Sequence, residues 1–139
     1  MRVVDGKYRK QSAPFLVPTT DGKLIAEHFG RASTGQSEVS IARMVAPPFW
    51  SEPAQRPEFD EYTLVIRGRK RVEVDGQELT LEAGESILVR RNVPVRYSNP
   101  FPAEVEYVSV CLPAFAPQLA HRQGPEEMPV DGASASTES

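Results

Sequence analysis

The chain has 139 residues, 40% of them hydrophobic and 25% charged, and this predicts a single globular domain with one buried core. Its net charge of -3 argues against nucleic-acid binding, because phosphate contacts depend on clustered lysine and arginine. A single cysteine, Cys111, excludes an internal disulfide. We find no signal peptide and no apolar stretch of roughly 20 residues, so we expect a cytoplasmic protein without a membrane partner.

Short segments of alternating apolar and polar residues, separated by 13 prolines and 9 glycines, predict an all-β protein. In chain order the expected strands are Leu24–Phe29, Val39–Val45, Glu61–Ile66, Val72–Val74, Gln77–Leu81, Ser86–Val89, Pro94–Ser98 and Glu104–Leu112. The Asp75-Gly76 pair predicts a tight hairpin, because a type I′ turn requires positive φ angles. Strands this short and this closely spaced indicate a sandwich or a barrel.

Two regions outside the strands have a distinct composition. The basic run from Arg67 to Arg71 is interrupted only by Gly68, and we interpret it as the solvated edge of a hairpin. After Leu112 a proline-rich exit segment carries Phe115 as an apolar anchor that could fold back over one end of a barrel. From Arg122 the chain is rich in Gly, Pro, Ser, Glu and Ala, which predicts a disordered tail.

Four residues lie at the spacing of two known motifs. Glu61 and Gly68 stand seven positions apart, and Gly84 and Asn99 enclose a second segment. This spacing resembles the cupin motifs G-x5-H-x-H-x3/4-E-x6-G and G-x5-P-x-G-x2-H-x3-N. The chain is similar to small single-domain bacterial cupins of the ethanolamine-utilisation type, and the resemblance implies a double-stranded β-helix, or jelly-roll, barrel.

The resemblance also sets the expected organisation of the chain. Residues 1–36 are expected to form N-terminal strands or an arm packed on the barrel, residues 37–115 the cupin barrel, and residues 116–139 the exit segment and tail. Many cupins dimerise through edge strands, so the resemblance also implies a homodimer, to which Phe15-Leu16-Val17 could contribute a strand.

The histidines that bind metal in cupins are missing. Their positions correspond to Gln55 and Pro57 (or Ala54 and Arg56) and to Val95, so that Glu61 is the one acidic ligand position retained. Zinc, iron or manganese sites of the usual cupin kind need imidazoles, and we therefore expect no metal and no cofactor. A less favoured alternative is a site for a hard cation made from Glu58, Glu61, Gln55 and His121.

Strand alternation predicts which side chains face the interior. In cupins the acid of the first motif points inward, which places Thr63 and Val65 inward with Glu61. Glu104 and Glu106 make a poor inner face, so the opposite residues of that strand should face inward. The expected lining is Glu61, Thr63, Tyr97, Asn99, Tyr107, Ser109 and Cys111. Arg43 joins it only if Val39 and Ile41 also point inward.

Two functions fit these residues, and both use a small-molecule partner. The first is a metal-independent lyase, isomerase or cyclase in which Glu61 transfers a proton, assisted by Tyr97 or Tyr107. Its expected substrate-binding residues are Gln55, Arg56, Glu58, Thr63, Asn99, Ser109, Trp50, Arg43 and His121. The second is a non-catalytic ligand-binding or sensor barrel.

Overall fold

The computed structural model describes residues 3–4 and 6–122, so the disordered tail predicted from Arg122 lies outside this range except for Arg122 itself. The strands are β1 (Val3–Val4), β2 (Tyr8–Arg9), β3 (Phe15–Leu16), β4 (Leu24–Phe29), β5 (Ser40–Ala46), β6 (Trp50–Ser51), β7 (Asp60–Arg67), β8 (Lys70–Val74), β9 (Gln77–Leu81), β10 (Ser86–Val89), β11 (Val95–Asn99) and β12 (Val105–Leu112). A short helix, α1 (Pro117–Ala120), follows them. The prediction of an all-β protein is confirmed.

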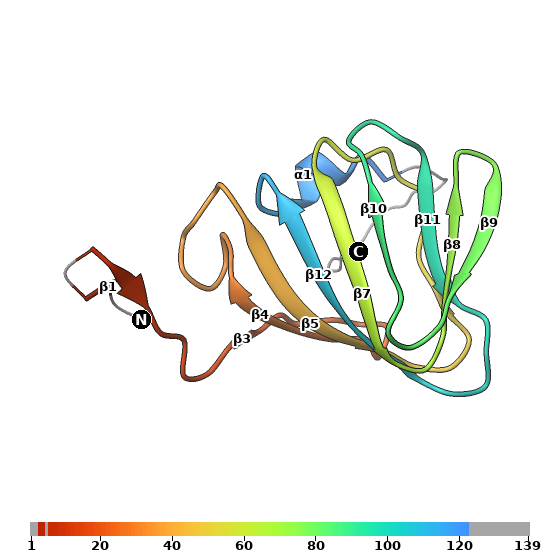
Figure 1. Cartoon of the computed structure of the whole chain (residues 1–139), viewed down its shortest axis with the longest axis horizontal. Coiled ribbons are helices and arrows are strands. Elements are labelled where there is room, and N and C mark those ends of the chain that lie inside the picture. Colours follow the sequence, from red (N-terminus) through yellow and green to blue (C-terminus); the bar gives the residue numbers. More distant parts are fainter. Residues whose placement is uncertain (1–2, 5, 123–139) are drawn as a thin grey trace.

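Two antiparallel sheets form the body of the molecule (Figure 1). One has six strands in the order β10-β7-β12-β5-β4-β3, and the other has four in the order β6-β11-β8-β9. The hairpin between β8 and β9 turns at Asp75 and Gly76, whose φ angles are 49° and 83°, as a type I′ turn requires. This is the jelly-roll arrangement that the motif spacing predicted.

The alternation along β7 sets the inner and outer faces of the larger sheet. Residues 61, 63 and 65 are buried and residues 62, 64 and 66 are exposed, as predicted. The inner faces of the two sheets contribute one apolar core, which includes Met44, Val65, Val72, Val95 and Val105. The buried polar side chains, which include Glu61, Thr63 and Ser109, lie between the same two sheets.

The exit segment covers the end of the barrel where β7 begins and β12 ends (Figure 1). There Phe59, Cys111 and Ala120 form a second apolar cluster, and the Phe59 and Phe115 rings pack edge to face with centroids 5.7 Å apart. The amide of Glu58 donates to the carbonyl of Leu119 at 2.8 Å. Helix α1 is thereby attached over this end. Within the described residues no helix is long and apolar enough to cross a membrane.

The N-terminal region adds to the larger sheet and also extends away from it. β4 pairs with β5, and β3 forms the edge of the sheet by pairing with β4 in the same chain. The small β1–β2 sheet stands apart from the barrel (Figure 1). Phe15 and Leu16 on the edge strand are both exposed. Dimerisation through this strand stays a prediction.

Candidate functional site

Glu61 lies inside the barrel on β7 and is only 2% exposed. The hydroxyl of Ser109, on the neighbouring strand β12, donates a hydrogen bond to its Oε2 atom. Ser109 Oγ also lies 4.0 Å from the sulfur of Cys111. A buried carboxylate needs such partners, because removing it from water disfavours its charged form. Ser109 therefore holds the Glu61 carboxylate in one position.

Tyr97 approaches this carboxylate from the opposite sheet, on β11. Its side chain is buried, and burial raises the pKa of the phenol well above its usual value of 10. The negative charge of Glu61 raises the pKa of Tyr97 further. The phenol consequently keeps its proton at neutral pH and can serve as a hydrogen-bond donor.

Two lysines are also buried in the barrel, which the sequence analysis did not predict. Lys23 and Lys70 are 2% and 1% exposed. Lys70 Nζ lies 3.5 Å from the Tyr107 ring centroid and 5.0 Å from that of Tyr97. Lys23 Nζ lies 4.3 Å from the Trp50 ring centroid. The interpretation of the basic run as a solvated edge is therefore wrong for Lys70, which stands on the inner face with Val72.

The positions that the motif alignment matched to the missing histidines include Gln55, Pro57 and Val95. Gln55 is fully buried and pairs through its backbone with Val95, and its side-chain amide donates to Glu52 Oε2 at 3.2 Å. Val95 and Pro57 have no side-chain atom able to bind a metal. Within residues 6–122 no three His, Cys, Asp or Glu side chains gather as a possible metal site. The residues present do not fit the metal centre of the family.

A surface pocket of about 640 Å³ lies near the end of the barrel that α1 covers, and its lining is basic. It is lined by Arg56, Glu58, Arg91, Asn92, His121 and Arg122. His121 and Glu58 form a hydrogen bond across it, and Arg56 donates to the carbonyl of Asn92 at 2.8 Å. Three predicted substrate-binding residues, Arg56, Glu58 and His121, are thus brought together outside the barrel, whereas Glu61 is inside it. The proposed cation site from Glu58, Glu61, Gln55 and His121 is not assembled.

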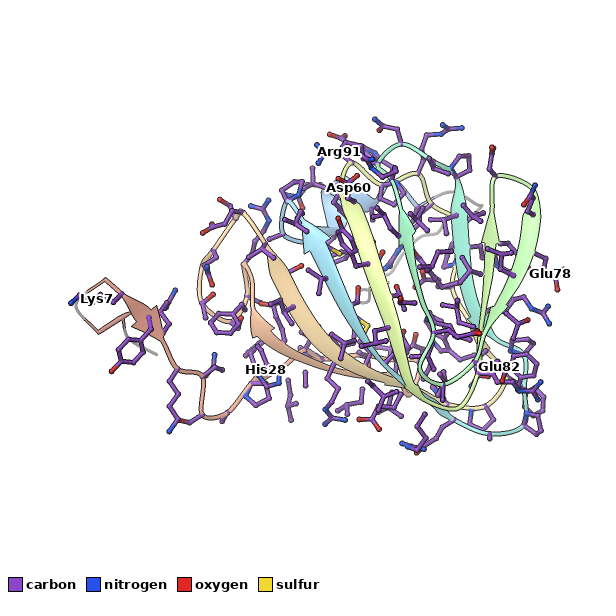
Figure 2. All side chains as sticks on the ribbon, viewed as in Figure 1. Lys7, His28, Asp60, Glu78, Glu82 and Arg91 are labelled. Atoms are coloured by element: carbon purple, nitrogen blue, oxygen red, sulfur yellow. The ribbon has the colours of Figure 1, made fainter. Side chains whose placement is uncertain are left out.

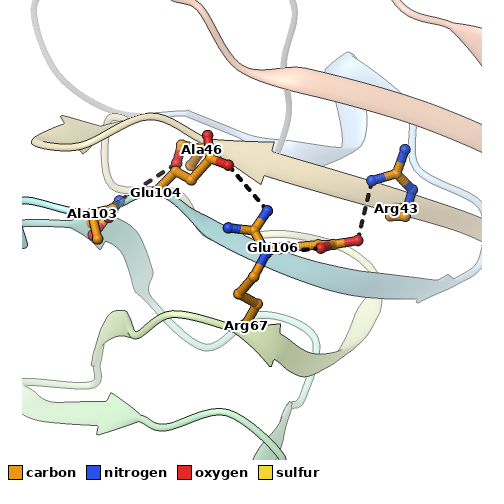
Figure 3. Close-up of polar contacts among 7 residues, drawn as sticks. Arg43, Ala46, Arg67, Ala103, Glu104 and Glu106 are labelled. Carbon is orange, nitrogen blue, oxygen red and sulfur yellow. Dashed lines mark hydrogen bonds and ion pairs between the residues drawn. The ribbon is translucent and has the colours of Figure 1, made fainter.

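Arg43 lies on the outer face of the larger sheet, which settles the orientation that the sequence left open. Its guanidinium pairs with Glu106 at 3.2 Å, and Arg67 pairs with Glu106 and Glu104 at 3.3 Å and 3.0 Å (Figure 3). The inner face of β5 instead carries small or apolar residues such as Ala42 and Met44. Arg43 therefore does not face the barrel interior, contrary to its place among the predicted binding residues.

Asn99 and Trp50 are buried, and both are engaged by neighbouring loops. The side-chain amide of Asn99 donates to the carbonyls of Pro47 and Ala103, each at 2.9 Å. The Trp50 indole donates to Asp21 at 2.7 Å. Thr63, Tyr107 and Ser109 are buried as predicted. These contacts show how the end opposite α1 is held, with Asn99 as a cross-link between two loops.

The family model described as Cupin domain matches residues 42–111, and the chain belongs to this family. Two solved structures under 25% identity share the fold. The cupin domain of an XRE-family transcriptional regulator from Enterobacter cloacae is 18% identical, with a TM-score of 0.56, covering 65% of this chain and 95% of that one. An ethanolamine utilization protein Q from Salmonella typhimurium is 17% identical, with a TM-score of 0.54, covering 67% and 71%.

A curated relative has a much higher sequence identity. Endoribonuclease YbeY of Myxococcus xanthus (strain DK1622) is 49% identical over 111 residues, which make up 80% of this chain. The chain spans only 38% of the length of that protein. The similarity is thus to a part of a larger protein.

Proposed function

We propose that this barrel binds a small polar organic molecule and performs metal-independent acid–base chemistry on it, with Glu61 as the proton-transfer group. The observation that carries the proposal is the meeting of Glu61, Ser109 and Tyr97 inside the barrel. These residues come from both sheets, so the folded barrel alone brings them together.

The three side chains supply complementary chemistry. A carboxylate can remove a proton from carbon or oxygen and return it, and a fixed position raises the efficiency of that transfer. Ser109 provides the fixed position, and Tyr97 can donate a hydrogen bond to a substrate oxygen on which negative charge develops. Proton transfer next to a carbonyl group is the step common to many lyases, isomerases and cyclases.

The loss of the metal ligands supports a mechanism that uses side chains alone. Val95 and Pro57 replace imidazoles with groups that cannot coordinate. The basic pocket near the covered end lies outside the barrel, and its Arg56 could attract an anionic substrate to that end of the molecule. The proposal thus concerns a polar substrate that carries a negative charge.

The test is exchange of substrate hydrogen for deuterium, followed by proton NMR with a panel of aldehydes, ketones and 2-oxo acids. We expect exchange with at least one class, and a loss of about 100-fold or more in Glu61→Gln. Glu82→Gln, the same change at an exposed acid, is the matched control. Metal content measured on the same samples completes the test. Exchange that persists in Glu61→Gln, or that follows a bound metal, would contradict the proposal.

A non-catalytic role as a ligand-sensing domain is the second candidate. It is favoured by relatives in which a similar domain is part of a larger protein, namely the Enterobacter regulator and the Myxococcus endoribonuclease. In this role the barrel binds its ligand and alters the action of a partner. Ligand binding of equal affinity in wild type and Glu61→Gln, without deuterium exchange in either, would favour it.

A further inference from the structure

We propose that Lys70 is a nucleophilic amine that forms an imine with a carbonyl-bearing substrate. The site would then take aldehydes, ketones or 2-oxo acids. This inference rests on the proposed function for its proton transfers, but the reactivity of Lys70 can be measured independently.

The placement of the lysines is the first observation. The chain has four lysines, and Lys7 and Lys10 are exposed whereas Lys23 and Lys70 are buried. Both buried amines face the same two rings. Lys23 Nζ lies 4.3 Å from the Trp50 centroid and 5.6 Å from that of Tyr107. Lys70 Nζ lies 5.6 Å and 3.5 Å from the same two centroids.

This arrangement favours an uncharged amine. Burial disfavours an ammonium ion, and so does a second ammonium ion nearby. The aromatic faces attract a cation, but here two amines share the same faces, so their charges compete. The carboxylates of the interior, Glu52 and Glu61, and Asp21 at the Trp50 indole act in the opposite direction and favour a charged lysine. An uncharged lysine is the nucleophile that imine formation requires.

A surface pocket provides an approach to the amines. It has a volume of about 330 Å³ and includes Phe49, Trp50, Arg71 and Arg96 in its lining. Trp50 lines this pocket, and its ring centroid lies 4.3 Å from Lys23 Nζ and 5.6 Å from Lys70 Nζ, so movement of this ring would open a path to the amines. Phe49 beside it has a φ of 60°, which is strained for a residue with a side chain. Arg71 and Arg96 are paired with Glu78 and Glu73, and by exchanging these partners they could bind the carboxylate of a 2-oxo acid.

The chemistry can be written with the residues present. Lys70 Nζ adds to the carbonyl carbon, and one amine hydrogen is transferred to the oxygen to give a carbinolamine. The hydroxyl group and the second amine hydrogen then leave as water, which gives the imine. Once protonated, the imine withdraws the electron pair of an adjacent C–H bond while Glu61 accepts the proton. Protonation on carbon and addition of water then release the product and Lys70. The protonated imine thus acts as the electron acceptor of the reaction.

Tyr97 connects the amine to the proton-transfer group. Its ring centroid lies 5.0 Å from Lys70 Nζ, and Glu61 raises the pKa of the phenol through its charge. The phenol is placed to donate a hydrogen bond to the oxygen that leaves as water. Lys70, Tyr97 and Glu61 therefore form one connected set from the two sheets.

The test is reductive trapping with cyanoborohydride and formaldehyde, the smallest carbonyl probe, followed by peptide mass spectrometry. At neutral pH we expect Lys70 to be methylated about tenfold or more faster than the exposed Lys7 and Lys10, which act as internal controls. With pyruvate in place of formaldehyde we expect one reduced adduct on Lys70. Methylation of Lys70 no faster than of Lys7 and Lys10 would overturn the proposal.

Two variants separate this role from a structural one. Lys70→Gln keeps an uncharged polar side chain among the rings but cannot form an imine, so it should fold and give no pyruvate adduct; an adduct that persists would place the reactive amine elsewhere. Lys23→Met removes the competing charge, so the fast methylation of Lys70 should shift to higher pH. An unchanged pH profile would contradict the charge competition. If Lys70 proves unreactive while Glu61→Gln still abolishes deuterium exchange, the proposed function stands without the imine.

Discussion

Ser109 and Glu61 are joined by a hydrogen bond inside the barrel, although 48 positions separate them in the sequence. They are not directly opposite each other: Ser109 pairs in register with Thr63, and Glu61 with Cys111. The bond is therefore diagonal between neighbouring strands, a contact that long or polar side chains make across a sheet. Its existence depends on the register of β7 and β12.

The Ser109–Glu61 bond predicts opposite effects for two neighbouring substitutions. Ser109→Ala removes a donor from a buried carboxylate, and we expect the free energy of unfolding to fall by about 1–3 kcal/mol. Thr63→Val is the matched control, because within the described residues the Thr63 hydroxyl has no hydrogen-bond partner. It should be neutral or stabilising. Urea unfolding of both variants checks this, and a larger loss in Thr63→Val would refute the assignment.

Asp60 predicts an acid-dependent part of the stability. Hydrogen bonds from the Arg91 side chain, and then from its backbone, lower the pKa of Asp60 to about 2. Figure 2 shows the two residues together at the upper end of the barrel. Because the folded pKa is lowered, the stabilisation is present above the unfolded value of 3.8 and is lost as the pH falls toward about 2.

Asp60→Asn should therefore lower the free energy of unfolding by about 1 kcal/mol at pH 7, a value typical of a partly exposed charged hydrogen bond. The difference from wild type should shrink below about pH 3. Asp75→Asn is the control, since asparagine also tolerates the positive φ of this turn. Thermal unfolding across the acid range is the measurement, and a pH-independent difference would count against the Arg91 interaction.

Much of the barrel could be predicted because its signals are local. Alternation placed Glu61 and Thr63 inward without knowledge of the other strands, and Asp75-Gly76 encoded its own turn. Lys70, in contrast, was predicted to be in solvent, because charged residues at strand ends are usually exposed. Its burial depends on Tyr97 and Tyr107, which come from strands far along the chain.

The positions of the residues predicted to bind substrate also depend on contacts between segments that are far apart in the sequence. Arg43 could not be oriented from its own strand, because apolar residues occupy both faces of β5. The pairing of Glu58 with His121 spans 63 positions and depends on how the exit segment folds back over the barrel. The one signal for Lys70 was its spacing of two and four residues from Val72 and Val74, which places all three on one face of β8.

Gly68, which closes the first motif, predicts a steric effect on stability. Its φ is 86°, and a Cβ atom there would lie 2.5 Å from the carbonyl oxygen of Glu104. Gly76 has a similar φ of 83° but open space around it. We expect Gly76→Ala to lower the free energy of unfolding by about 1–2 kcal/mol because of its backbone conformation alone. Gly68→Ala should lower it by roughly 1–3 kcal/mol more, because its Cβ atom would also collide with the carbonyl oxygen of Glu104. Equal losses in chemical unfolding would show that the neighbouring chain can move away.

The raised pKa of Tyr97 predicts a loss of stability in alkali. The folded protein holds the phenol proton more tightly than the unfolded chain does, because burial and the charge of Glu61 both disfavour the phenolate. The stabilisation is therefore complete below the unfolded pKa of about 10 and declines as the pH rises above it, by up to about 1.4 kcal/mol per pH unit. Tyr97→Phe has no proton to lose, so its unfolding free energy should fall less steeply over this range.

Urea unfolding between about pH 8 and pH 11 measures this difference in slope. Tyr62→Phe is the matched control, because the Tyr62 ring lies on the exposed outer face of β7. It should retain the steep wild-type slope. Were Tyr97→Phe to lose stability in parallel with wild type, the phenol would ionise as readily in the folded barrel as in the unfolded chain. Tyr97 would then be an unsuitable proton-retaining donor beside Glu61, and the proposed acid–base set would lose one of its three members.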